Sequence, residues 1–263
     1  MSDDPDEIFP AGTALDFGTA PYPFMRVPGR SAIDAVHHLS ITHQDQTPVI
    51  WGDDEEATRL FEVFNDPGHE LPSPSDVIQK ATSRSAATLS AVYKEQIRES
   101  VAAFYRRLGK PNPYDEASRE TDPGPPRGTW PEHIQPHEQL VSLLDHRTKD
   151  FKKEVLIGLL PTSKRWAIAA YLGFGNWNSC PPPEVHVAHA REWFESYGAK
   201  PVLNSADTIE FFVERPIEDR NTALEMALVH HEYCSDIVDQ GVGTIDALAA
   251  HIYGAQYWYF WWD

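Results

Sequence analysis

Residues 176–189, NWNSCPPPEVHVAH, combine side chains that can act as nucleophile, base or metal ligand. Cys180 stands three residues before a helix that Pro183 is expected to begin, and His186 lies one turn into that helix. A helix N-terminus and a neighbouring imidazole both favour the thiolate form of a cysteine, which is its nucleophilic form. The three prolines after Cys180 remove N–H groups that an oxyanion hole would use. A catalytic cysteine is one hypothesis for this stretch, and a rigid loop leading into a helix is the other.

A second segment, residues 233–243 (YCSDIVDQGVG), holds the other cysteine and two aspartates. Thiolate, imidazole and carboxylate are ligands that zinc prefers, so Cys180, His186 and Cys234, with Asp236, are weak metal candidates. Their spacing is unlike the paired arms of known zinc motifs, so we predict no cofactor, with zinc as the alternative. We favour the interpretation that both cysteines are small buried side chains. A permanent disulfide between them is not expected in a reducing cytosol.

Apparent motifs elsewhere lack residues that their chemistry requires. HHEYC, residues 230–234, is followed by Ser235 where the second histidine of the H-E-x-x-H zinc motif would stand. GVGT, residues 241–244, lacks the preceding strand and the third glycine of a dinucleotide-binding loop. The sequence contains neither G-x-x-x-x-G-K-[ST] nor G-x-S-x-G. The sequence therefore lacks the standard motifs of zinc metalloproteases, dinucleotide-binding loops, P-loops and α/β-hydrolases.

The elements that must position these residues alternate between strands and helices. Apolar periodicity and turn residues predict strands at 154–161, 200–205, 208–215 and 256–263, and helices at 183–198, 221–234 and 244–254. The order β-α-β-β-α-(α)-β is that of a ferredoxin-like fold, so we predict the α+β class. With a right-handed crossover, the loop 173–182 and the segment 233–243 would lie at the same end of the sheet.

That juxtaposition predicts one candidate site at the end of the sheet. Trp177 belongs to it because it is a large aromatic residue among Gly, Asn and Ser. The predicted members are Trp177, Asn178, Cys180, Glu184, His186, Cys234, Asp236, Asp239 and Gln240. The closing stretch QYWYFWWD is aromatic on both faces, and as an edge strand it must be covered by the N-terminal half or by a second subunit.

The first part of the chain is predicted to be a mainly helical, proline-rich accessory region, residues 1–150. TPVIWG (47–52) is a short apolar strand and DDEEATRLFEVF (53–64) a helix. Residues 86–109 form the clearest helix, whose apolar stripe is Leu89, Val92, Ile97, Val101 and Phe104. Seven prolines between 109 and 136 indicate a linker or a long surface loop, and the α+β domain then spans 151–263.

Composition restricts the class of partner. The 263 residues include 41% hydrophobic and 11% aromatic residues, enough for a core, and carry a formal net charge of −18. This negative field repels phosphate backbones and anionic lipid, so we expect neither nucleic acid nor membrane as a partner, and a basic protein is the partner that charge allows. The acidic N-terminus has no targeting segment and there are only two cysteines, which predicts a cytoplasmic protein.

Four stretches carry a resemblance to a known family. WAIAAYLGFGNWNSCPPPEVHVAHAREWFESYGA, TIEFFVERP, YCSDIVDQGVGTIDALA and YWYFWWD follow in the order found in DUF4253, a bacterial domain family of unknown function, which the chain resembles over roughly residues 155–263. TPVIWGDDEE is similar to material that often precedes that domain. The resemblance implies a compact cytosolic domain and no established activity.

Two functional hypotheses follow. The first is a non-enzymatic binding or interaction module with an acidic surface, an immunity-like factor being one form of it, because catalytic signatures are missing and aromatic residues are abundant. The alternative is a small thiol- or metal-dependent hydrolase that uses Cys180, His186 and Cys234. The sequence leaves the oligomeric state open between monomer and dimer.

Overall fold

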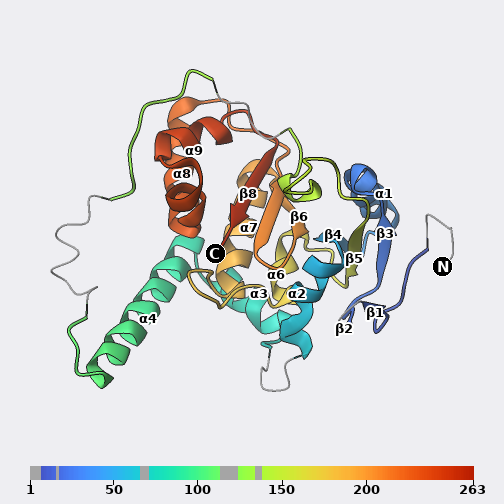
Figure 1. The fold of residues 1–263 in the computed structure, drawn as a ribbon, viewed down its shortest axis with the longest axis horizontal. Coiled ribbons are helices and arrows are strands. Elements are labelled where there is room, and N and C mark those ends of the chain that lie inside the picture. Colours follow the sequence, from blue (N-terminus) through green and yellow to red (C-terminus); the bar gives the residue numbers. More distant parts are fainter. Residues whose placement is uncertain (1–6, 16–17, 66–70, 113–123, 134–137) are drawn as a thin grey trace.

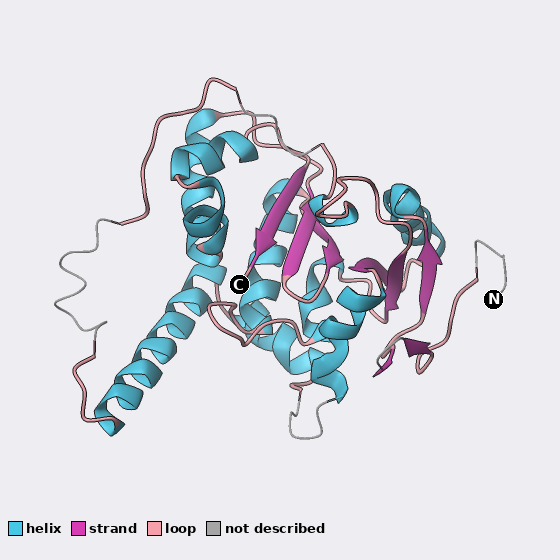
Figure 2. Ribbon diagram, viewed as in Figure 1, coloured by secondary structure: helices cyan, strands magenta, loops and turns pink. Residues whose placement is uncertain are grey.

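The computed structural model describes residues 7–15, 18–65, 71–112, 124–133 and 138–263. Within these ranges the chain forms one mixed six-stranded sheet, a two-stranded ribbon and surrounding helices (Figures 1 and 2). The predicted α+β class is confirmed. Within the same ranges, no helix has both the length and the apolar character needed to cross a membrane.

The strand order is β3-β5-β4-β6-β7-β8. In that order the strands are β3 (Phe24–Val27), β5 (Val155–Leu160), β4 (Thr47–Gly52), β6 (Lys200–Asn204), β7 (Thr208–Phe212) and β8 (Tyr257–Trp261). Among these neighbours β4 and β6 are parallel, and every other pair is antiparallel. The ribbon consists of β1 (Ala14–Leu15) and β2 (Gly18–Thr19).

The helices include every one that the sequence predicts, together with several short ones. They are α1 (Ala32–Thr42), α2 (Asp54–Asn65), α3 (Pro74–Ser83), α4 (Ala86–Arg107), α6 (Ile168–Leu172), α7 (Pro183–Tyr197), α8 (Arg220–Tyr233) and α9 (Ile245–Ile252), with the 3₁₀ turns η1 (Gly29–Ser31), η2 (Val141–Leu143) and η3 (Arg165–Ala167) and the π-helical turn η4 (Ile237–Val242). Capping residues fix the ends of two of these helices. Thr244 caps α9 by accepting a hydrogen bond from Ala247 N, and Gly198 ends α7 in the left-handed conformation.

The ferredoxin-like strand order is not confirmed, because β4 from the N-terminal region lies between β5 and β6. β5 is antiparallel to β4, and β4 is parallel to β6, so β5 and β6 run in opposite directions. The predicted parallel crossover from β5 to β6 is therefore wrong. The cause is β4 itself, whose residues are all buried, so that it occupies a central position that a pattern within residues 151–263 cannot reveal.

Residues on both sides of position 150 share this sheet and its cores. Successive strand residues alternate between two buried clusters, with Trp51 of β4 on one face and Ile50 on the other. Trp51 packs on Gly158 of β5, where an added Cβ would lie 1.7 Å from the indole ring. Since residues 7–150 also contribute β3 and β4, the N-terminal region is not only helical.

Helix α4 departs from its predicted burial. Leu89 is buried, but Ile97 and Phe104 are 43% and 50% exposed. In Figure 1, α4 begins against the body of the protein, and its far end stands away from the other described elements. Part of the predicted proline-rich loop, residues 113–123 and 134–136, lies outside the described residues, and its described stretch 124–133 contains no helix or strand.

Candidate functional site

The loop 173–182 and the segment after α8 lie together at one end of the sheet. Asn178 Nδ2 donates to Asp263 O at 2.7 Å, and Ser179 Oγ donates to Asp236 Oδ2 at 3.4 Å. This is the end where β6 and β8 finish. The topology predicted from the sequence placed both segments where β5 and β6 finish together. Because β5 runs opposite to β6, this is the end where β6 finishes and β5 begins.

Cys180 and His186 belong to a buried cluster that also contains Tyr233. Cys180 Sγ lies 3.5 Å from His186 Nε2, and His186 Nδ1 shares a hydrogen bond of 2.6 Å with the Tyr233 hydroxyl. Phe174 and Trp262 pack edge-on against the imidazole. Aromatic rings and hydrogen bonds therefore enclose both groups whose chemistry the sequence singles out, and each is at most 1% exposed.

Burial determines the protonation of this cluster. Desolvation, and then repulsion from His189, lowers the pKa of His186 to about 3. Desolvation also raises the pKa of the Cys180 thiol, with the negative charge of neighbouring acidic groups acting in the same direction. Near neutral pH the pair is thus a thiol beside a neutral imidazole, which is the unreactive state of a cysteine.

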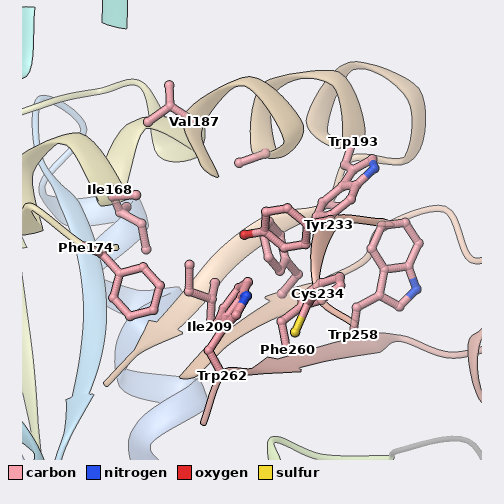
Figure 3. Close-up of a cluster of buried hydrophobic side chains, with 14 of the residues drawn as sticks. Ile168, Phe174, Val187, Trp193, Ile209, Tyr233, Cys234, Trp258, Phe260 and Trp262 are labelled. Atoms are coloured by element: carbon pink, nitrogen blue, oxygen red, sulfur yellow. The ribbon is translucent and has the colours of Figure 1, made fainter. Parts of the chain in front are cut away.

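Two more histidines extend the buried cluster along α7 and α8. His189 Nε2 shares a hydrogen bond of 2.9 Å with Ser90 Oγ, which ties α7 to α4. His230 packs against Trp193, Trp258 and Phe260, and within the described chain its Nε2 has no hydrogen-bond partner. Figure 3 shows how Trp193, Trp258 and Phe260 converge with Tyr233 on one side of the sheet.

Strand β8 is an edge of the sheet, and its main chain faces alternately towards β7 and outward. Val213 N donates to Gln256 O at 2.8 Å and Trp262 N donates to Asp207 O at 3.1 Å. The even-numbered residues of this stretch therefore direct their N–H and C=O groups to β7, and the odd-numbered residues direct theirs to the open edge.

Two residues of the predicted site form hydrogen bonds with main-chain groups at the C-terminal end of the open edge of β8. Cys234 Sγ donates to Trp261 O at 3.0 Å, and Asp236 Oδ2 accepts from Asp263 N at 3.0 Å. An exposed strand edge is prone to pair with other chains, so these contacts protect the end of β8. In the described residues Cys234 thus has a structural role, because its thiol is hydrogen-bonded to a main-chain oxygen.

Other predicted members point elsewhere. Glu184 faces α3, where it pairs with Lys80 at 3.6 Å, and Asp239 is exposed and pairs with His231 at 3.3 Å. Trp177 packs edge-on against Phe174 and, with Asn178, lines a polar pocket of about 480 Å³ next to the β6–β7 turn. Among the residues described, no group of three or more His, Cys, Asp or Glu side chains could hold a metal ion.

A second hollow lies along the open edge of β8, and we call it the edge pocket. It has a volume of about 350 Å³ and runs from η2 to α8, η4 and α9. Its lining consists of Val141, His230, Asp236, Ile237, Gln240, Gly241, Val242, Leu248, His251, Ile252, Tyr257, Trp258, Tyr259 and Trp261. Asp236 and Gln240 are the two members of the predicted site that reach it.

Sequence reasoning missed the other lining residues of the edge pocket. The aromatic run of β8 was the available signal, since it marked an edge strand that needs cover, and α8, η4 and α9 provide part of that cover. His230 carried no signal of its own, because a histidine on a helix is as often a buried core residue as part of a site.

One wall of the edge pocket depends on a buried carboxylate. Glu210 of β7 is fully buried, and its two oxygens accept hydrogen bonds from Val141 N at 2.7 Å and Ser142 N at 2.8 Å. Desolvation raises the pKa of Glu210 to about 7, although these hydrogen bonds act in the opposite direction. Glu210 therefore anchors η2, and with it Val141, against the sheet.

Comparison with known proteins finds one family match, which covers the C-terminal part of the chain. Residues 156–263 match the family described as Domain of unknown function (DUF4253), so the resemblance seen in the sequence is confirmed for this part of the chain. The match begins within β5 and includes α6 to β8, and so it contains the buried cluster and most of the edge pocket. No curated protein and no solved structure matches the chain.

Proposed function

We propose that the protein is a non-enzymatic binding module and that the edge pocket is its binding site. The observation that carries this proposal is the form of the pocket. Its volume of about 350 Å³ falls within the range of about 300–1,000 Å³ that is usual for ligand sites. Apolar and aromatic walls surround a few polar groups, among them Asp236 and His230, whose Nε2 has no hydrogen-bond partner in the part of the chain that the structure describes.

The burial of Cys180 and His186 favours the binding hypothesis and argues against a thiol-dependent reaction. A nucleophilic cysteine must reach the thiolate form and meet a substrate, whereas Cys180 is fully buried and desolvation raises its pKa. His186, the base that such a reaction would use, is equally buried and hydrogen-bonded to Tyr233. The two residues therefore act as core residues in this proposal.

The partner in this proposal is basic. With a formal net charge of −18, the protein attracts positively charged molecules and repels nucleic acid and anionic lipid. A cytoplasmic protein partner that inserts a side chain into the edge pocket fits both the charge and the size of the site, and an immunity-like role would be one instance of it.

A fragment screen tests the binding proposal. Small aromatic and amine fragments should shift the NMR signals of residues that line the edge pocket of the full chain. Leu248→Trp fills the pocket and should abolish these shifts, whereas Leu228→Trp, the same exchange at an exposed position of α8, should preserve them. If Leu248→Trp does not fold, Gln240→Trp at the exposed mouth provides the same block.

Fragments that bind elsewhere, or that still bind when the pocket is filled, would remove the edge pocket as the site. Thiol labelling is the second readout, since Cys180 should react with a disulfide reagent only when the protein is unfolded. Rapid stoichiometric labelling of Cys180 in the folded protein would contradict the proposal and favour a thiol-dependent activity.

A further inference from the structure

The edge pocket has one acidic side chain in its lining and two histidines, His230 and His251. Asp236 lines the pocket, and no lysine or arginine does so among the residues that the structure describes. Desolvation, followed by repulsion from His189, holds the pKa of His230 well below its usual value, so this imidazole is neutral near pH 7. A ligand that enters therefore meets a carboxylate and neither a lysine nor an arginine to repel a cation.

The carboxylate of Asp236 is fixed in position. Its Oδ2 accepts from Asp263 N at 3.0 Å and from Ser179 Oγ at 3.4 Å, and only 8% of the residue is exposed. A carboxylate held in place among apolar walls attracts a cation more strongly than one on a flexible, solvated side chain, because fewer water molecules screen the charge.

Strand β8 supplies the aromatic side chains of the lining. The strand contributes Tyr257, Trp258, Tyr259 and Trp261 to the pocket. The faces of such rings are electron-rich and attract cations, and clusters of them are the usual recognition site for alkylated ammonium groups. A single carboxylate, by contrast, is a poor site for a hard metal ion, which requires about six oxygen ligands.

We infer that the edge pocket selects an alkylated ammonium group, held among the rings of β8 and paired with Asp236. This inference rests on the proposed binding function and specifies its ligand class. The same chemistry is found in a free small molecule such as choline and in a methylated lysine side chain of a basic protein partner.

The sharpest test compares two probes of the same shape that differ in charge. Choline carries a trimethylammonium group, and dimethylbutanol carries a tertiary butyl group in its place. In NMR titrations of the unmodified full chain, choline should bind the edge pocket about tenfold more tightly than dimethylbutanol. Equal or tighter binding of the neutral probe would overturn the ammonium inference.

A matched pair of variants tests the role of the carboxylate. Asp236→Asn keeps a hydrogen-bond acceptor for Asp263 N but removes the charge, and should weaken choline binding about tenfold while leaving dimethylbutanol unaffected. Asp239→Asn removes an exposed charge three residues away, outside the pocket lining, and should leave both affinities unchanged. If Asp236→Asn does not fold, the comparison of the two probes on the unmodified chain decides the question alone.

A third arm separates the two sources of the ligand. A short peptide that contains trimethyllysine should bind more tightly than choline if the natural ligand is a protein side chain, and no better than choline if it is a small molecule. Failure of the inference and failure of the proposed function remain distinguishable. Fragments that bind the pocket while choline does not would overturn the inference alone, whereas a pocket that binds neither fragments nor choline would overturn both.

Discussion

The buried cluster and the edge pocket both use residues of α8, and they differ in what fills them. The cluster of Cys180, His186 and Tyr233 contains the side chains that are typical of catalysis, but neighbouring rings occupy the space around them. The edge pocket has few such side chains and leaves about 350 Å³ open. Residue types typical of chemistry therefore indicate a site only where the fold leaves room for a ligand.

The same comparison explains the energetic roles of the two regions. Histidines in the cluster are desolvated and neutral, so they stabilise the fold only while they remain unprotonated. The edge pocket is instead lined by Asp236 and several aromatic residues of β8 around an open volume. Changes to the cluster should thus alter stability, and changes at the mouth of the pocket should alter binding.

The largest expected effect is the loss of stability in acid. His186 and His189 have pKa values of about 3 in the folded protein and about 6.5 when unfolded, so the unfolded chain binds more protons between these values. The free energy of unfolding should fall as the pH is lowered from about 6.5 towards 3, by up to roughly 5 kcal/mol for each histidine. Urea unfolding at pH 7, 6 and 5 measures this slope.

A variant pair isolates the contribution of His186. His186→Gln should reduce the acid-side slope by about one proton, because the titrating group is gone. His231→Gln makes the same exchange at a partly buried histidine of α8 that pairs with Asp239, and it is the matched control. An unchanged slope in His186→Gln would mean that His186 is accessible and charged, which would weaken the contrast between cluster and pocket.

The second effect concerns Glu210, and it has the opposite sign. Its pKa is raised to about 7 in the folded protein, from about 4.5, so the folded state binds the extra proton and stability should fall as the pH rises through this range. The loss should be on the order of 3 kcal/mol. Glu210→Gln should abolish it, whereas Glu225→Gln, at an exposed position of α8, should not. Unfolding free energies at pH 5 and pH 8 provide the comparison.

The smallest effect separates the two regions directly. Tyr233→Phe removes the hydroxyl that bonds to His186 Nδ1 and should cost about 1–3 kcal/mol, because a buried nitrogen loses its partner. Gln240→Ala, at the exposed mouth of the edge pocket, should change the free energy of unfolding by no more than about 0.5 kcal/mol. Urea midpoints measure both, and a larger cost for Gln240→Ala would show that the pocket is also part of the stabilising core.

Much of the local structure could be predicted because its causes lie close together in the sequence. TPVIWG forms β4 over the predicted residues 47–52, and α7 runs from Pro183 to the residue before Gly198, as its first-turn proline and its stop glycine indicate. Thr244 caps α9 as expected. These elements depend on periodicity and on capping, which act over a few residues.

The candidate site could be predicted only in part. The loop with Cys180 and the segment with Asp236 do lie together at the end where β6 finishes, but β5 begins at that end, because β4 separates β5 from β6 and β5 runs the other way. Glu184 belongs to the same stretch and still points to α3, because the turn of α7 directs it there. A position in the sequence does not specify which neighbour a helical side chain meets.

The sequence by itself determined most of the elements after residue 150, the acidic charge and the resemblance of residues 156–263 to DUF4253, since short-range patterns and composition encode them. Only the tertiary structure decided that β4 separates β5 from β6, that Cys180 and His186 are enclosed, and that a pocket remains open beside β8. The physical reason is that strand pairing and burial depend on contacts between distant segments, and the free energy of those contacts appears only when the chain has folded.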